Sequence, residues 1–251
     1  MRIGIISGHE IIEITRGFEE ITVETRYGKV DLLIGNYKDK DVVFLNRHQG
    51  NLPPHRINYL ANIEALKLSK VDSIISFGTV GSLNPKIKPG FIVIPDDFID
   101  FTKNRRYSFF DDSRIHIDMT DPFCPYIRKI LIDSCKELEV DFQERGVYLA
   151  TEGARLETKA EIRLFSDYAD IVGMTLVPEV VLAREKEMCY GAICLACNMA
   201  AGIQDSLSAE EIKSFFNEKK KIISDILGLA ILKVENERNC RCREALKEAK
   251  L

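Results

Sequence analysis

Short apolar runs alternate with helical stretches along most of this chain, and that alternation limits the possible folds more than any other feature. The runs that predict strands cover residues 2–7, 29–34, 41–45, 71–76, 91–95, 146–150, 169–174 and 188–196. Helical patterns cover residues 55–69 and 125–138. Strands that alternate with helices form a largely parallel sheet covered on both faces. We therefore expect one α/β domain over residues 1–251, with a central, mostly parallel mixed sheet.

Local signals mark three further helix starts. Thr158 with Glu161, and Ser208 with Glu211, have the spacing of a capping box, in which each side chain bonds the other residue's backbone N–H. Pro178 suits the first turn of a helix, where its missing N–H costs nothing. The second box predicts a long, charged C-terminal helix and tail from about residue 208.

Composition and charge exclude several classes of protein. The 251 residues include 35 Lys and Arg against 39 Asp and Glu, a net charge of −4, which argues against a nucleic-acid binder. No apolar run approaches the roughly 20 residues of a membrane span. The hydrophobic content of 45% is spread through the chain and excludes disorder and a coiled coil. The first residues show no secretory signal pattern, so the cytoplasm is the expected location.

The spacing of the seven cysteines gives no paired set of C-x-x-C motifs, so we do not expect a zinc site. Those in or beside apolar runs are expected to be small buried side chains. The pair in Cys240-Arg241-Cys242 lies in a charged tail, where burial is not expected. The full set is Cys124, Cys135, Cys189, Cys194, Cys197, Cys240 and Cys242.

Ligands of such folds bind at the carboxyl ends of the strands. That rule selects five loops, which are rich in Gly, Ser, Thr, Asn or charge and can present backbone N–H groups to an anion. These loops are residues 7–10, 46–51, 78–83, 151–158 and 197–202.

Segments in and around these loops resemble the trimeric purine nucleoside phosphorylase and methylthioadenosine phosphorylase family. They are residues 89–100 (PGFIVIPDDFID), residues 116–125 (HIDMTDPFCP), Gly173-Met174-Thr175 with Val177-Pro178-Glu179, and Asn198 with Ala200-Ala201-Gly202. The resemblance runs from Gly4 to about Ile212 and implies the nucleoside phosphorylase fold. It also implies phosphorolysis, in which phosphate attacks C1′ of a purine nucleoside and releases the base. Phosphate is then a co-substrate, and no cofactor or metal is needed.

The resemblance places six residues around phosphate, and they are Ser7, His9, Arg47, His48, Thr79 and Thr175. Arginine can bind phosphate through two parallel hydrogen bonds, although a surface salt bridge is the plain alternative for Arg47. An ordinary strand-to-helix turn is the alternative for Thr79. The family pattern is altered at Ser7-Gly8-His9-Glu10, where His9 replaces the usual Thr. The loop after His48 is also about two residues shorter than usual, and His55 is expected to start a helix.

The base site of the family maps onto three residues. Leu156 stands where relatives carry Phe, and it can still pack on a purine face. Glu157 matches the carboxylate that reads N1–H of 6-oxopurines; a helix-start charge is its alternative. Asn198 can donate to N7 of the base, and it stands where methylthioadenosine-type enzymes carry Asp. A turn-forming Asn is the plain alternative there.

The sugar site of the family maps onto Met174, His116 and Ala209. Met174 resembles the residue that packs under the ribose. His116 resembles one that reaches into the site of a neighbouring subunit, so a homotrimer or hexamer is implied. Ala209 stands where nucleoside enzymes carry a His for the 5′-hydroxyl. With Leu207 and Ile212 it would make an apolar end that suits a 5′-methylthio group.

The leading interpretation is therefore phosphorolysis of 6-oxopurine nucleosides, namely inosine, guanosine or 5′-methylthioinosine. A methylthioadenosine phosphorylase is the runner-up. A silent nucleoside-binding relative is a third hypothesis, supported by the altered 7–10 loop. Some heat-loving family members carry a C-terminal C-x-C, and the Lys- and Glu-rich tail fits a thermophile. We expect Cys240 and Cys242 to form a strained, reversible redox pair, with two free thiols as the alternative.

Overall fold

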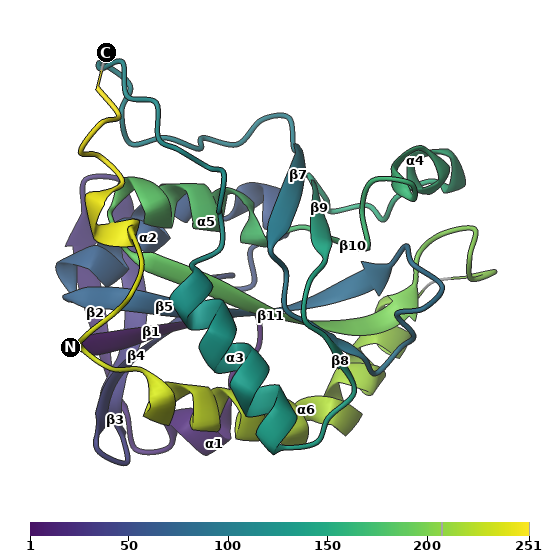
Figure 1. Cartoon of the computed structure of the whole chain (residues 1–251), viewed down its shortest axis with the longest axis horizontal. Helices are drawn as coiled ribbons and strands as arrows, with labels where there is room; N and C mark the ends of the chain where they lie inside the picture. Colours follow the sequence, from purple (N-terminus) through teal and green to yellow (C-terminus); the bar gives the residue numbers. More distant parts are fainter. Residues whose placement is uncertain (207, 251) are drawn as a thin grey trace.

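The structure is a computed structural model that describes residues 1–206 and 208–250, without the side chains of Ala209 and Glu211. Eleven strands of the described part form one sheet (Figure 1). They are β1 (Arg2–Ser7), β2 (Glu19–Thr25), β3 (Gly28–Tyr37), β4 (Lys40–Asn46), β5 (Val71–Ser82), β6 (Ile92–Val93), β7 (Asp97–Phe101), β8 (Phe142–Gln143), β9 (Val147–Thr151), β10 (Ile171–Gly173) and β11 (Cys189–Met199).

The sheet is mixed, as expected, with parallel strands at its centre. Its main path runs β2-β3-β4-β1-β5-β10-β9-β7, and β11 leaves β5 as a branch that continues to β6 and β8. β1 pairs in parallel with β4 and β5, and β11 pairs in parallel with β5. The β2–β3 and β3–β4 pairs are antiparallel, as is the β5–β10 pair. The carboxyl ends of β1, β4, β5 and β11 therefore meet at one edge.

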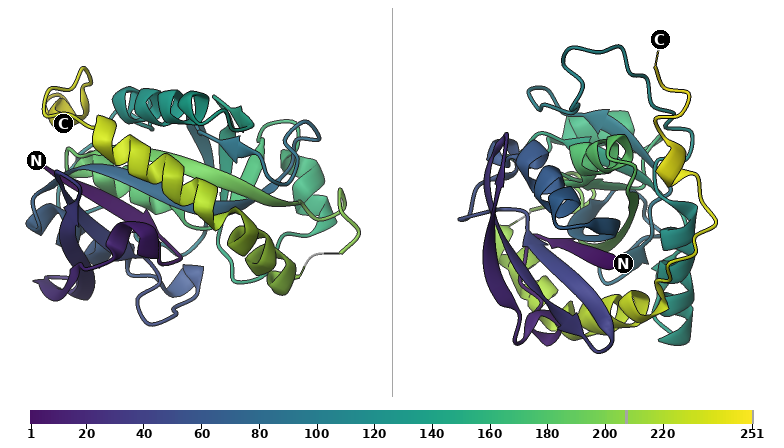
Figure 2. Two further views of the ribbon diagram at one scale, coloured as in Figure 1. Left: turned by 90° about the horizontal axis from the view of Figure 1, so that it is seen from below. Right: turned by 90° about the vertical axis from the view of Figure 1, so that its left-hand side faces the viewer.

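Helices cover both faces of this sheet (Figure 2). α2 (Tyr59–Leu68) and α5 (Leu176–Glu185) pack against one face, which carries strand residues such as Ile6 and Val43. The opposite face carries strand residues such as Ile3 and Ile5. It is covered by α1 (Ile12–Thr15), α3 (Pro125–Glu137) and α6 (Ala209–Lys233). α4 (Lys159–Phe165) joins a smaller cluster beside β9 and β10. In the described part of the chain, no helix is both long enough and apolar enough to cross a bilayer.

Several element bounds differ from the sequence prediction. The loop expected at residues 78–83 is mostly strand, because β11 pairs with β5 as far as Ser82. The strand expected at residues 91–95 is only Ile92–Val93. β2 and β7 were not predicted, since both are rich in charged residues and lie at the two ends of the main strand path.

The predicted helix starts agree with the structure in part. Thr158 and Glu161 form the full capping box at α4. The helix expected over residues 55–69 is instead a 3-10 turn, Pro54–Arg56, followed by α2, whose Asn58 side chain accepts from the Ala61 N–H. α6 begins at Ala209, directly after Ser208, but the predicted box there also involves Glu211, whose side chain lies outside the described part.

The C-terminal tail folds back along the molecule instead of extending into solvent. It passes through a 3-10 turn, Cys242–Glu244, and its end lies beside the 101–124 loop (Figure 1). There the Ala249 carbonyl accepts from the His116 N–H at 2.7 Å. The expectation that the cysteines of the tail stay exposed is wrong for Cys242, which is 1% exposed because the tail covers the start of β11.

Candidate active site

A cavity of about 200 Å³ opens at the sheet edge where the carboxyl ends of the central strands meet. Its walls come from the ends of β1 and β4, from β5, β10 and β11, and from the first turn of α6. Nine of the residues singled out by sequence line it, and they are His9, Arg47, His48, Thr79, Leu156, Glu157, Met174, Thr175 and Asn198.

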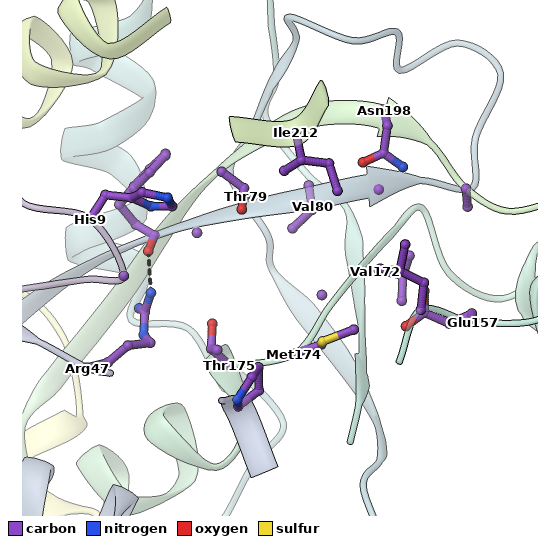
Figure 3. Close-up of a pocket in the computed structure, with 18 of the residues that line it drawn as sticks. His9, Arg47, Thr79, Val80, Glu157, Val172, Met174, Thr175, Asn198 and Ile212 are labelled. Atoms are coloured by element: carbon purple, nitrogen blue, oxygen red, sulfur yellow. Dashed lines mark hydrogen bonds between the residues drawn. The ribbon is translucent and has the colours of Figure 1, made fainter. Parts of the chain in front are cut away.

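These side chains gather at two opposite ends of the cavity (Figure 3). His9, Arg47, Thr79 and Thr175 lie at one end, and Asn198 and Glu157 lie at the other. Met174 lies between the two groups. One end therefore carries positive charge and hydroxyl groups, while the other carries an amide and a carboxylate.

Arg47 is held rigidly in the cavity wall. It is 2% exposed, and its Nε and Nη2 donate to Glu179 at 2.7 and 3.3 Å. Nη2 also donates to Ser76 Oγ at 2.6 Å, and Nη1 donates to the Phe77 carbonyl at 2.8 Å. A guanidinium has five N–H groups, so one N–H on Nη1 remains for a ligand. Arg47 does form a salt bridge, with Glu179, but the pair is buried in the cavity wall. The alternative of a surface salt bridge for Arg47 is therefore wrong.

The charge of Arg47 survives its burial. Burial opposes a positive charge, but the adjacent Glu179 carboxylate outweighs it and raises the pKa of Arg47. Glu179 is itself 1% exposed and also accepts from Tyr190 Oη at 2.7 Å and from Ser76 Oγ at 3.1 Å. A positive group in this geometry attracts an anion without having to reorganise. From the sequence, Glu179 was recognised only as part of the Val177-Pro178-Glu179 motif. The signal that could have singled it out is its position as an acidic residue between apolar helix residues.

Two neutral imidazoles lie beside this arginine. Burial and nearby positive groups, including Arg47, lower the pKa of His9, whose ring stacks on Phe216 at 4.1 Å. Burial also lowers the pKa of His48, although its bond to Leu52 acts in the opposite direction. His48 Nδ1 lies 2.7 Å from the Leu52 carbonyl, which can only accept, so Nδ1 carries the proton. A neutral His48 ring therefore offers Nε2 as an acceptor.

Thr79 and Thr175 direct their hydroxyl groups towards each other across the same end of the cavity (Figure 3). Thr79 sits within β5, so the ordinary turn considered for it is wrong. Thr175 precedes α5, but its side chain makes no capping bond to that helix. Its backbone N–H donates instead to Tyr148 Oη at 3.1 Å. Both hydroxyl groups can therefore serve a ligand instead of the backbone.

At the other end, a β-bulge directs Asn198 into the cavity. The β11–β5 register shifts between Ala196 and Asn198, so that Asn198 faces Gly81. Asn198 Nδ2 donates one hydrogen to the Met199 carbonyl at 2.8 Å, which leaves its second hydrogen for a ligand. Glu157 accepts from Thr151 Oγ1 at 2.6 Å and is half-buried. The end thus pairs a fixed donor with a fixed acceptor.

Apolar side chains form the middle of the cavity. Leu156 lines it while remaining 39% exposed, and Met174 packs against the loop at Gly153. Gly153 has φ +69°, and a Cβ there would lie 2.7 Å from Met174 Sδ. Glycine is needed at that position because any side chain would displace Met174.

Arg105 was missed by the sequence analysis and holds two of these loops together. Its Nη1 donates to the carbonyls of Met174 and Val177, both at 2.6 Å. Its Nη2 donates to the carbonyls of Thr151 and Glu152, at 3.1 and 2.8 Å. Arg105 is 8% exposed and belongs to a segment read only as loop, so nothing local in the sequence indicated this role.

Two of the predicted residues do not line the cavity of this chain, and the side chain of a third lies outside the described part. Ser7 is buried behind it, and its Oγ accepts from the His9 N–H at 3.1 Å. His116 is exposed near the C-terminal tail, outside the cavity. The side chain of Ala209 lies outside the described part, as does Leu207, whereas Ile212 does line the cavity.

One cavity of this α/β fold therefore combines a guanidinium and two hydroxyl groups at one end with an amide and a carboxylate at the other. The chain matches the model of the Phosphorylase superfamily over residues 2–232, and it belongs to that superfamily.

Similar proteins agree with this assignment. A probable 6-oxopurine nucleoside phosphorylase of Dictyoglomus turgidum is 46% identical, over 99% of this chain and 97% of its own. A probable S-methyl-5′-thioinosine phosphorylase of Methanocaldococcus jannaschii is 45% identical, over 98% of both. Among solved structures, methylthioadenosine phosphorylase of Schistosoma mansoni in complex with adenine has a TM-score of 0.93 at 26% identity, covering 100% and 99% of the two chains.

Proposed function

We propose that this chain is a purine nucleoside phosphorylase that acts on 6-oxopurine nucleosides, including 5′-methylthioinosine. A phosphate oxygen forms a bond to C1′ while the C1′–N9 bond breaks and its electron pair leaves with the purine. The products are the free base and ribose 1-phosphate or its 5-methylthio form. The observation that carries this proposal is the presence of both ends, anion and base, in one cavity.

Phosphate would bind at the end formed by Arg47, Thr79 and Thr175. The free N–H of Arg47 Nη1 and the two hydroxyl groups are donors suited to phosphate oxygens. Fixing phosphate beside C1′ replaces a bimolecular encounter with an oriented one. No cofactor is required, because phosphate is itself the nucleophile.

The leaving purine would be recognised by Asn198 and Glu157. The free Asn198 hydrogen can donate to N7, which stabilises the negative charge that develops on the base. The Glu157 carboxylate can accept from N1–H of a 6-oxopurine. A 6-aminopurine has a lone pair on N1 instead, which would face the carboxylate unfavourably. The Glu157 carboxylate therefore favours 6-oxopurines over methylthioadenosine.

Methylthioadenosine phosphorolysis is kept as the second candidate because of Ile212, which gives the cavity an apolar wall. The same wall suits a 5′-methylthio group on either base. The 5′ substituent and the base are therefore separate questions.

A base-release assay separates these possibilities. Inosine, 5′-methylthioinosine and 5′-methylthioadenosine would each be incubated with the protein, with and without phosphate, and the free base measured by chromatography. We expect release that requires phosphate and is faster for the two 6-oxopurine substrates. Purine binding with no phosphate-dependent release would instead identify a silent relative.

The functional unit would be a homotrimer or a hexamer. His116 is exposed and outside the cavity of its own chain, which fits a role in the sugar site of a neighbour. Each site would then be complete only in the assembly.

A further inference from the structure

Four cysteines meet at one point on the side of the molecule where the tail folds back. Cys124 precedes α3, Cys189 begins β11, and Cys240 and Cys242 belong to the tail. Their four Sγ atoms all lie within 4.8 Å of one another, and the Cys189 and Cys240 sulfurs are 3.4 Å apart. No local sequence pattern indicates this cluster, because its members come from three separate segments.

The spacing of these sulfurs suits one tetrahedral metal ion. Zinc–sulfur bonds of 2.3 Å place the four sulfurs of a tetrahedral site about 3.8 Å apart. A disulfide needs its two sulfurs at about 2.05 Å, whereas all seven cysteines of the chain are free thiols here. We propose that Cys124, Cys189, Cys240 and Cys242 bind a single zinc ion in a closed, structural site. This proposal replaces both the absence of a zinc site and the Cys240–Cys242 bridge expected from the sequence.

The charges around the cluster support this assignment. Arg238 Nη1 donates to Cys189 Sγ at 3.1 Å, and Arg184 Nη1 donates to Cys242 Sγ at 3.4 Å. Neither arginine forms an ion pair with a carboxylate of the described residues. Four thiolates around Zn²⁺ carry a net charge of −2, which two guanidinium groups would neutralise. N–H groups that donate to metal-bound sulfurs are a usual outer layer of such sites.

Hydrogen-bond donors without partners around the cluster also support a metal–thiolate centre. The Nε atoms of Arg184 and Arg238, and Nη2 of Arg238, are buried with no hydrogen-bond partner in the described part of the chain. Buried N–H groups that lack a hydrogen-bond partner are costly, and more so on a charged side chain. A doubly negative metal–thiolate centre beside them would offset that cost by electrostatic attraction.

The site would fasten the tail to the body of the protein. Binding needs no oxidant, because each thiol releases its proton to solvent as its sulfur binds the ion. The tail then stays where its Ala249 carbonyl accepts from the His116 N–H. Zinc would thereby support the loop that carries His116, at a distance from the substrate cavity and with no part in the bond-breaking step.

The first test measures metal in the full-length protein purified under reducing conditions. Elemental analysis should give about one zinc per chain. Cys240→Ser should lower that content to near zero, whereas the matched control Cys135→Ala, which changes a buried cysteine outside the cluster, should keep it. Since metal content is read without substrate, the result does not depend on the proposed activity.

A second measurement covers the case in which Cys240→Ser fails to fold. X-ray absorption of the wild-type zinc protein should show four sulfur neighbours at about 2.3 Å. The proposal is overturned by metal-free protein with four free thiols, or by a mass lower by four hydrogens, which indicates two disulfides. It is also overturned by nitrogen or oxygen ligands around the zinc, or by full zinc content in folded Cys240→Ser.

Discussion

Arg47 and Glu179 form a buried two-point ion pair, with Nε–Oε1 at 2.7 Å and Nη2–Oε2 at 3.3 Å. The two residues are 132 positions apart, one directly after β4 and the other on α5. The pair fixes the guanidinium plane, and its one free N–H is left on Nη1. A preorganised donor of this kind keeps its full strength when an anion arrives, since no side chain has to move first.

The first prediction concerns phosphate binding. Arg47→Ala should raise the KM for phosphate by roughly 10- to 100-fold, because a hydrogen bond to a charged group contributes about 1.5–3 kcal/mol. The KM for the nucleoside should change much less. Steady-state kinetics with each substrate varied in turn measure both values, and thermal unfolding checks that the variant is folded. An unchanged phosphate KM would remove Arg47 from the anion site.

The second prediction concerns Glu179 as a positioning residue. Glu179→Gln leaves the Arg47 charge buried without its counter-ion, which should cost about 3–5 kcal/mol of unfolding free energy. Denaturant unfolding measures this cost, and the phosphate KM should rise at the same time.

Glu185→Gln is the matched control, because Glu185 lies on the same helix and accepts from the Phe109 N–H, which a Gln can also satisfy. Its phosphate KM should stay near the wild-type value. Equal effects of the two substitutions on phosphate KM would mean that Glu179 acts only through general stability.

The third prediction concerns pH. Burial is the main cause that lowers the pKa values of His9 and His48, so both rings are neutral at pH 7 and gain charge only below pH 6.5. The neutral rings stabilise the free protein above the unfolded pKa of about 6.5, and that contribution is lost as pH falls towards the folded pKa values. A bound anion has the opposite effect on the two histidines, because it stabilises their protonated rings and so raises their pKa values.

Sulfate is the suitable probe, since it stays doubly charged across this range. Its inhibition constant should fall as pH is lowered from about 8 to about 5. His9→Gln and His48→Gln should each flatten that dependence. If both variants keep the wild-type pH profile, the imidazoles do not contact the anion.

The apolar runs predicted most of the strands, although β5 and β11 extend to Ser82 and Met199, beyond their predicted ends at residues 76 and 196. The contacts between distant elements were predicted poorly. Arg47, Thr79 and Asn198 were found because each lies in a loop expected after an apolar strand, where the motifs of the family could be matched. Glu179, Arg105 and the four clustered cysteines act through partners in distant segments. Nothing in a single sequence reports that Arg47 and Glu179 meet, or that the tail returns to the start of β11.

The fourth prediction concerns assembly. His116→Ala should lower kcat/KM for the nucleoside if His116 completes the sugar site of a neighbouring subunit. The control His55→Ala changes another exposed histidine, in the 3-10 turn Pro54–Arg56, and should have little effect.

Mixing subunits tests the shared site directly. His116→Ala and Arg47→Ala subunits, each of low activity, should regain activity after they are unfolded and refolded together. Some mixed sites then contain an intact Arg47 from one chain and an intact His116 from the next. Sedimentation that shows a fully active monomer would contradict this arrangement.

The last prediction concerns the choice of base. Asn198→Asp replaces the amide hydrogen that faces the cavity with a carboxylate oxygen, which cannot donate to N7 unless it is protonated. Activity on inosine should fall by about 10-fold or more, because one hydrogen bond to a developing charge contributes about 1.5–3 kcal/mol. The change should shift the preference towards 6-aminopurines, whose exocyclic amino group can donate to the new carboxylate. Because Ala200 remains, the shift should be partial. The ratio of kcat/KM for 5′-methylthioinosine and 5′-methylthioadenosine, measured for both proteins, decides the matter; a wild-type protein that prefers the adenosine form tenfold would contradict the assigned role of Asn198.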